Sequence, residues 1–142
     1  MKEKSLIGWR EWVALPEIGI DRIKAKVDTG ARTSALHAFE VDHYKARRQD
    51  RVRFFIHPFQ KTKDIVVECD AAVIDFRFVT DSGGHREKRY VIQTQLLIGQ
   101  EQWPIEITLT DRETMKFRML LGRTAMRKHL IVDPGKSFLL GK

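Results

Sequence analysis

One short segment of the sequence has the residue types and spacing of a hydrolytic site. Asp28, Thr29, Gly30 and Ala31 follow the alternating stretch Ile23–Val27, so a strand would deliver an acidic side chain into a tight turn of small residues. Two such turns could bring two carboxylates together to share one proton, because Gly30 leaves room and Ala31 keeps the wall small. Thr29 could hydrogen-bond across the pair. The ionised carboxylate would activate water as a general base, and the protonated one would polarise a carbonyl group.

A turn-forming role is the alternative for Asp28, because Asp-x-Gly is also a common turn sequence. A second segment favours the catalytic interpretation. Phe117–Arg123 lies downstream of the turn and is a hydrophobic run that ends in Leu-Leu-Gly-Arg and leads into a predicted helix.

The elements that would position these residues are mostly strands. Short runs rich in Val, Ile, Phe and Thr recur between Gly, Pro and Asp breakers, which is typical of an all-β domain. We expect strands at Trp9–Leu15, Ile23–Val27, Val52–His57, Ile65–Glu68, Ala72–Thr80, Tyr90–Ile98, Trp103–Thr110, Phe117–Leu121 and Ser137–Leu140. In the clearest alternation Ile105, Ile107 and Leu109 would face a core, and the residues between them would face water.

Two further elements complete the predicted organisation. Asp81–His85 contains two glycines between strand-like runs and predicts the tip of a β-hairpin. The only expected helix is short, Arg123–Lys128, and its last residues are basic, which suits the C-terminal end of the helix dipole. At 142 residues the chain fits one hydrophobic core, so we expect a single domain over residues 1–142.

The paired segments resemble those of the retropepsins, in which an Asp-Thr-Gly-Ala turn is backed by a hydrophobic-hydrophobic-Gly-Arg segment. Asp28–Ala31 and Leu120–Arg123 match that pair. Val27–Ala38 and Arg89–Thr94 are similar to the bacterial retropepsin-like family often labelled ATP-dependent zinc protease, and the resemblance covers nearly the whole chain. It implies a closed acid-protease β-barrel with one short helix near the C-terminus. It also implies a homodimer that supplies Asp28 from each subunit, with Leu120–Gly122 packed beneath the turn.

The expected site combines this resemblance with the chemistry of the side chains. The residues that we expect there are, for catalysis, Asp28, Thr29 and Gly30, and, for substrate binding, Ala31, Arg32, Gly83, Gly84 and Arg123. The two later glycines belong to Asp81–His85, the candidate flap over the substrate. Viral retropepsins have an acidic residue at the position of Arg32, which pairs with the arginine of the Gly-Arg segment. Here Arg32 would face Arg123 without a partner, so the two could grip a substrate carboxylate; a subunit contact or solvent is equally open for Arg123.

The net charge of +7 favours an anionic partner, which could be an acidic peptide, nucleic acid or the ribosome surface. The resembling family is associated with ATP-grasp ligases that add glutamates to a ribosomal protein. An aspartic peptidase that acts on acidic, glutamate-rich tails, such as those of a glutamylated ribosomal protein, would therefore suit this charge. The alternative is a non-catalytic basic β-barrel that binds RNA or the ribosome, with Lys45–Phe59 the closest approach to an aromatic and basic run.

No cofactor, metal or membrane is expected. The chain has no Walker-type glycine loop for ATP, and its histidines are scattered, with His37, Asp42 and His43 the only local grouping. The single cysteine, Cys69, is expected to be a small buried residue. No apolar run approaches the length that crosses a bilayer, and the first residues lead into no signal-like stretch, so the cytoplasm is the expected location.

Overall fold

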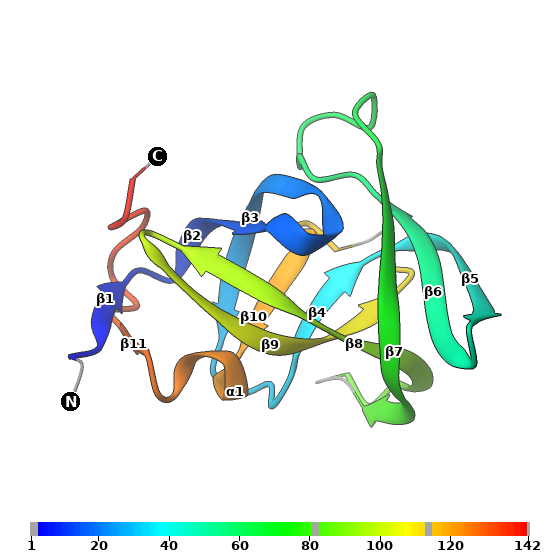
Figure 1. Cartoon of the computed structure of the whole chain (residues 1–142). Coiled ribbons are helices and arrows are strands. Elements are labelled where there is room, and N and C mark those ends of the chain that lie inside the picture. Colours follow the sequence, from blue (N-terminus) through cyan, green and yellow to red (C-terminus); the bar gives the residue numbers. More distant parts are fainter. Residues whose placement is uncertain (1–2, 81–82, 113–114, 142) are drawn as a thin grey trace.

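The computed structural model describes residues 3–80, 83–112 and 115–141 (Figure 1). Its strands are β1 (Ser5–Ile7), β2 (Arg10–Leu15), β3 (Ile20–Asp28), β4 (Ser34–His37), β5 (Phe39–Ala46), β6 (Gln49–Ile56), β7 (Val67–Thr80), β8 (Arg86–Ile98), β9 (Glu101–Thr110), β10 (Met119–Gly122) and β11 (Leu130–Val132). A single 3-10 turn, η1 (Pro16–Ile18), and a short helix, α1 (Arg123–Met126), complete the described part. The all-β prediction with one short helix near the C-terminus is confirmed.

Most strands belong to one sheet that curls back on itself. Its order is β2-β3-β10-β4-β9-β8-β7-β6-β5, and a further pairing of β2 with β8 at Ala14 and Leu97 brings the first six strands of this order into a ring. β7, β6 and β5 extend from the ring as an arm, on the right of Figure 1. β1 and β11 form a separate parallel pair at the opposite side, where both chain ends lie.

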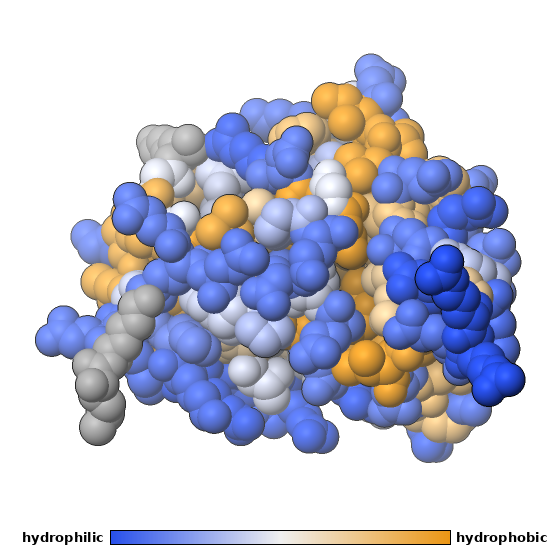
Figure 2. Space-filling view, in the orientation of Figure 1, coloured by the Kyte–Doolittle hydropathy of each residue, from blue (hydrophilic) through white to orange (hydrophobic). Residues whose placement is uncertain are grey.

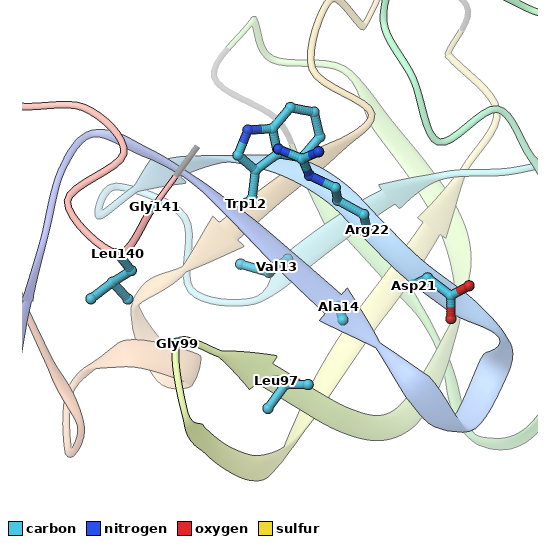
Figure 3. Close-up of a pocket in the computed structure, with 9 residues that line it drawn as sticks. All are labelled: Trp12, Val13, Ala14, Asp21, Arg22, Leu97, Gly99, Leu140 and Gly141. Atoms are coloured by element: carbon cyan, nitrogen blue, oxygen red, sulfur yellow. The ribbon is translucent and has the colours of Figure 1, made fainter.

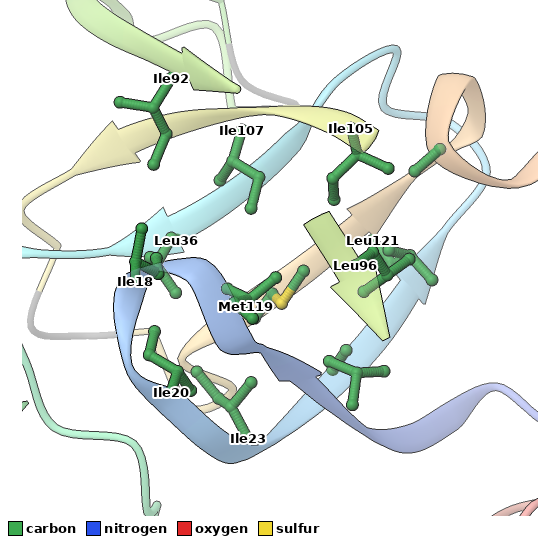
Figure 4. Close-up of a cluster of buried hydrophobic side chains, with 14 of the residues drawn as sticks. Ile18, Ile20, Ile23, Leu36, Ile92, Leu96, Ile105, Ile107, Met119 and Leu121 are labelled. Atoms are coloured by element: carbon green, nitrogen blue, oxygen red, sulfur yellow. The ribbon is translucent and has the colours of Figure 1, made fainter. Parts of the chain in front are cut away.

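The core fills the inside of the ring. Figure 4 shows Ile23 of β3, Leu36 of β4, Ile107 of β9 and Met119 of β10 pointing toward one another, and all four are fully buried. Burial of each such side chain stabilises the fold by about 1.5–3 kcal/mol. The strands around the turn after β3 therefore share one hydrophobic core, which fixes their positions.

The alternation predicted for β9 is only partly correct. Ile105, Ile107 and Leu109 are buried as expected, but Thr108 and Thr110 are buried as well, with exposures of 1% and 4%. β8 is the strand paired beside β9, and these two threonines make hydrogen bonds to its charged side chains Arg89 and Glu87. A polar residue on the outer face of a strand is thus covered by a neighbouring element.

Four strands were missed, each with a weak period-two pattern. All residues of β4 are buried, so the alternation that reveals a strand is absent. β5 is an edge strand with polar side chains on both faces, and β1 and β11 are only three residues long. Conversely, the expected strand Ala72–Thr80 and the second half of the expected strand Ile65–Glu68 belong to one strand, β7, which begins at Val67 and has a register shift between Val73 and Asp75.

The expected strand Ser137–Leu140 is wrong. Phe138 has a positive φ of 53°, which interrupts an extended chain. The N–H groups of Leu139 and Leu140 donate to the carboxylate of Glu11 instead of to a strand. A buried side chain, which local pattern cannot reveal, thus holds this segment.

The expected hairpin is present. β7 and β8 pair antiparallel up to Thr80 and Arg86, and Gly84 between them has a φ of 83°, which glycine adopts without strain. Asp81 and Ser82 lie outside the described residues. Among the described residues, no helix is long and apolar enough to span a membrane.

Candidate active site

The turn after β3 presents a partly exposed carboxylate. Asp28 is the last residue of β3, and its carbonyl oxygen accepts the N–H of Ala31 at 3.2 Å, which closes the turn. Its Oδ1 accepts the N–H of Gly30 at 3.1 Å. Asp28 is half-buried, whereas Thr29 and Gly30 are exposed. Within the described residues the Asp28 carboxylate has no ion-pair partner, so this side chain is available to a molecule outside the turn.

β10 supports this turn from beneath. It lies between β3, to which it runs parallel with Gly122 beside Asp28, and β4, to which it runs antiparallel. A Cβ at Gly122 would lie 2.5 Å from the carbonyl carbon of Thr33 and 2.8 Å from the backbone nitrogen of Ser34. The N–H of Gly122 donates to Ser34 Oγ at 3.0 Å. Only glycine allows the chain to pass this closely at position 122.

Arg123 links the Asp28 turn to the start of α1 through hydrogen bonds. Its Nη1 donates to the carbonyl oxygen of Gly30 at 3.1 Å, and its backbone N–H donates to the carbonyl of Ala31 at 2.9 Å. The next N–H, of Thr124, donates to the carbonyl of Arg32 at 3.1 Å. The alternatives for Arg123 were a substrate carboxylate, a subunit contact and solvent. None of them included this contact within its own chain.

Arg32 shares a hollow with residues other than Arg123. It lines a hollow of about 270 Å³ beside the Asp28 turn, and Arg123 is not among the walls of that hollow. We call this hollow the arginine pocket. Its walls are Arg32, Thr33, Arg77, Gln93, Pro104, Ile105, Glu106, Thr124, Ala125 and Arg127. The structure therefore brings Arg32 together with two arginines, Arg77 and Arg127, that the sequence did not single out.

In the described part of the chain, Arg77 is the one of these three arginines whose side chain has hydrogen-bond partners. It donates to Asp75 at 3.1 Å, to Glu106 at 3.4 Å and to Thr33 Oγ1 at 3.5 Å. It lies between Phe76 and Phe78 on β7, and alternation along the strand puts it on the opposite face from those exposed rings. That alternation was the sequence signal that could have pointed to Arg77.

A partly buried polar network joins the β7–β8 hairpin to β9 near the hairpin tip. Arg89, only 7% exposed, donates to Glu87 at 2.6 Å and to Thr108 at 3.3 Å, and Thr110 donates to Glu87 at 2.5 Å. Desolvation would raise the pKa of Glu87, but the hydrogen bonds from Thr110 and Arg89 outweigh it and hold this pKa below 4.5. Gly83 and Gly84, the expected flap residues, are exposed at the end of this hairpin.

A second hollow, of about 260 Å³, lies away from the turn (Figure 3). Its walls come from β2, β3, the end of β8 and the C-terminal segment, and Trp12 and Arg22 stack at its rim with the guanidinium carbon 3.9 Å from the ring centre. None of the residues expected at the site lines it. We therefore assign it no chemistry.

The two histidines of the candidate metal site, His37 and His43, have different partners. His37 is buried and its Nδ1 accepts the N–H of Arg112 at 3.1 Å, while His43 contacts Asp50 at 2.9 Å. In the part of the chain that the structure describes, no three His, Cys, Asp or Glu side chains gather as a metal site would need. Cys69 is buried as expected, and burial raises the pKa of its thiol to about 12, which makes it unreactive.

Comparison with known proteins adds the family. A family model described as "RimB-like: Retropepsin-like aspartic endopeptidase RimB" matches residues 6–142. Proteins named "Probable alpha-L-glutamate ligase" are similar to this chain. The one from Shewanella pealeana is 45% identical over 98% of the chain, and the one from Parasynechococcus marenigrum is 44% identical over 99%. The chain spans about 30% of the length of these curated relatives.

A solved structure shares the fold. A crystal structure of a Legionella pneumophila protein of unknown function superposes with a TM-score of 0.80 over 97% of this chain and 99% of the other, at 23% identity. At this identity the likeness concerns the fold alone. The ring of strands with its arm is therefore an arrangement that a distant sequence also adopts.

Proposed function

Because the chain belongs to the RimB-like family of retropepsin-like aspartic endopeptidases, as its sequence motifs indicated, we propose that it is an aspartic-type peptidase. Two copies would pair so that each contributes Asp28, and the ring of strands would act as the closed acid-protease barrel that holds the turns. The observation that carries the proposal is the Asp28 turn, with a partly exposed carboxylate and a backbone fixed from beneath by Gly122.

The proposed reaction is hydrolysis of a peptide bond by water. The ionised carboxylate of the pair takes a proton from a water molecule as its oxygen bonds to the carbonyl carbon. The protonated carboxyl donates to the carbonyl oxygen, and the amine leaves with a proton when the C–N bond breaks. The two carboxyls titrate as a coupled pair. The Gly30 N–H bond to Asp28 Oδ1 supports this chemistry by orienting the carboxylate.

A second copy is needed because Asp-Thr-Gly occurs once in the sequence. Two carboxylates must share a proton for the general acid and base roles to separate. A closed point-group dimer would supply both from identical surfaces.

We propose acidic, glutamate-rich peptide or protein tails as the substrate, and a glutamylated ribosomal protein would present such a tail. The net charge of +7 supports an anionic ligand. The relatives named as glutamate ligases are about three times longer than this chain, and one region of each resembles it. These relatives join a region like this chain to the rest of a protein named as a glutamate ligase. This arrangement supports a glutamate-containing chain as the substrate.

The test is cleavage of a glutamate-tailed peptide and a neutral control peptide by the wild type and by Asp28→Asn. Loss of the general base should lower kcat by roughly 10²–10⁴-fold. Asp21→Asn, an exposed aspartate of the same strand, is the matched control and should cleave like the wild type. Equal rates for wild type and Asp28→Asn would end the catalytic assignment.

One observation favours the RNA- or ribosome-binding alternative. Phe76 and Phe78 on β7 are 45% and 53% exposed, and cations from β8 cover them, with Lys88 5.1 Å from the Phe76 ring and Arg86 4.1 Å from the Phe78 ring. Figure 2 shows hydrophobic surface on this side of the molecule, among hydrophilic residues. Aromatic rings interleaved with basic groups are the pattern on which single-stranded nucleic acid stacks.

This alternative predicts that Phe76→Ala combined with Phe78→Ala weakens binding of a short single-stranded RNA by about tenfold or more. Fluorescence anisotropy measures the affinity, and Asp28→Asn should bind RNA as the wild type does. Binding that is unaffected by the two phenylalanine substitutions would remove the alternative.

A further inference from the structure

The arginine pocket is lined by two arginines whose side chains have no hydrogen-bond or ion-pair partner among the described residues. Arg77 is occupied by Asp75, Glu106 and Thr33. Arg32 and Arg127 have no hydrogen-bond or ion-pair partner for their side chains anywhere in residues 3–80, 83–112 and 115–141. The pocket therefore carries three positive charges against one wall carboxylate, that of Glu106.

The pocket is held rigidly beside the Asp28 turn. Arg32 follows that turn directly, and its carbonyl oxygen accepts the N–H of Thr124, so the wall is tied to α1. Thr33 is the next residue, and its hydroxyl meets Arg77 of the hairpin strand β7. A group bound in this pocket would thus contact the Asp28 turn, α1 and the β7–β8 hairpin.

Size and charge indicate what the pocket can hold. Its volume of about 270 Å³ is just below the roughly 300–1,000 Å³ of pockets for drug-sized molecules, so it suits a side chain better than a cofactor. Guanidinium forks match the planar carboxylate, which can accept two parallel N–H bonds. The Glu106 carboxylate would repel a second negative charge, which favours a singly charged carboxylate over a phosphate dianion.

We propose that the arginine pocket is a specificity subsite, in which Arg32 and Arg127 bind the side-chain carboxylate of an acidic residue flanking the bond to be cleaved. This inference rests on the proposed peptidase function and names the residues that select its acidic substrate. Arg77, fixed by Glu106 and Thr33, would shape the wall and add to the field without being the main contact.

The experiment compares two peptides of identical sequence, except that glutamates flanking the cleaved bond in one are glutamines in the other. Arg32→Gln combined with Arg127→Gln should lower kcat/KM for the glutamate peptide by roughly 10- to 100-fold, mainly through KM, because charge-assisted hydrogen bonds are lost. The glutamine peptide should be cleaved as before. Lysine at both positions should restore part of the preference, since it keeps the charge and loses the fork.

The control Lys45→Gln also removes a positive charge, from β5 at the far end of the sheet order. It should leave kcat/KM for both peptides unchanged. A double variant that retains the full preference for glutamate would overturn the subsite while leaving the peptidase proposal intact.

A binding measurement separates the two proposals. In the Asp28→Asn background, the anisotropy of a labelled glutamate peptide reports affinity without turnover, and Arg32→Gln with Arg127→Gln should weaken it about tenfold or more. If the wild type cleaves nothing but this loss is seen, the peptidase proposal fails and the carboxylate site stands. If short RNA displaces the peptide and its own binding also depends on Arg32 and Arg127, the site recognises phosphate and the inference is wrong.

Discussion

At the residue scale, Gly122 decides how closely β10 can lie beneath the Asp28 turn. A side chain there would collide with backbone atoms of Thr33 and Ser34, which cannot rotate away as a side chain can. The N–H of Gly122 also donates to the side-chain Oγ of Ser34. The position of the carboxylate thus depends on a residue that itself carries no chemistry.

We predict that Gly122→Ala lowers the free energy of unfolding by about 1–3 kcal/mol, because the added methyl group overpacks a closed contact. Urea denaturation measures the change. Gly135→Ala is the matched control, since its Cβ would lie 3.4 Å from Asp133 Oδ1, an ordinary contact, and its cost should be clearly smaller. Equal costs for the two substitutions would contradict the importance of the close approach.

At the scale of elements, the β7–β8 hairpin has two different faces. Phe76 and Phe78 are exposed on one face, whereas Arg77 reaches the arginine pocket on the other. The hairpin is fixed near its tip by the Glu87, Arg89 and Thr110 network. The hairpin is therefore joined to β9 by side-chain hydrogen bonds close to its end.

The network predicts an acid-dependent loss of stability. The pKa of Glu87 is lowered in the folded protein, so its contribution is present above 4.5, the ordinary value, and is lost as the pH falls below 4.5 through the lowered pKa. Glu87→Gln should cost about 1 kcal/mol at pH 7, a small value because the Glu87 side chain is 42% exposed and solvent screens the pair.

Urea unfolding of wild type and Glu87→Gln at pH 7, 5 and 3.5 checks this prediction. The difference between the two proteins should shrink toward the lowest pH. Glu68→Gln removes an exposed carboxyl from β7 and serves as the control. A difference that stays constant with pH would show that the ionised form of Glu87 contributes nothing.

At the scale of the whole molecule, Glu11 ties the two ends of the chain together. It is 1% exposed, and its carboxylate accepts the N–H groups of Gly8 at 2.7 Å, Leu139 at 2.9 Å and Leu140 at 3.2 Å. Buried donors left without an acceptor are costly. This side chain of β2 therefore helps to hold the C-terminal segment, together with the backbone hydrogen bonds of Trp9 to Lys136 and of Phe138 to Arg10.

We predict that Glu11→Gln lowers the free energy of unfolding by about 1.5–3 kcal/mol, because an amide nitrogen would replace one acceptor and face an N–H donor. Limited proteolysis should then cut the C-terminal segment faster than in the wild type. Glu3→Gln, at an exposed glutamate, is the control for loss of charge. Unchanged stability and proteolysis would show that the segment is held by other contacts.

Pairing of two copies makes a prediction about mixtures. With a ninefold excess of Asp28→Asn and free exchange of subunits, roughly one tenth of the wild-type protomers would pair with one another, so activity per wild-type protomer should fall to about one tenth. An equal mass of albumin should have no effect. Activity that ignores the added Asp28→Asn protein would mean that one protomer is sufficient.

Features that depend on neighbouring residues could be read from the sequence. The Asp28 turn, the hairpin around Gly84, the start of α1 at Arg123 and the buried isoleucines of β9 all follow from local spacing, because alternation and turn chemistry act within a few residues. The same reasoning failed for β4, which is buried on both faces, and for Ser137–Leu140, which binds a distant carboxylate. Local pattern has no information about such partners.

The arrangement around the turn was decided only by the tertiary structure. From the sequence we expected Arg32 and Arg123 to face one another. In the structure Arg123 donates to the Gly30 carbonyl, and Arg32 lines a pocket with Arg77 and Arg127. Which side chains share a pocket depends on the order and register of β10, β9 and β7, and many registers satisfy the same alternation. The sequence by itself thus determined the acidic turn and the all-β class, whereas packing of the ring determined which charges surround that turn.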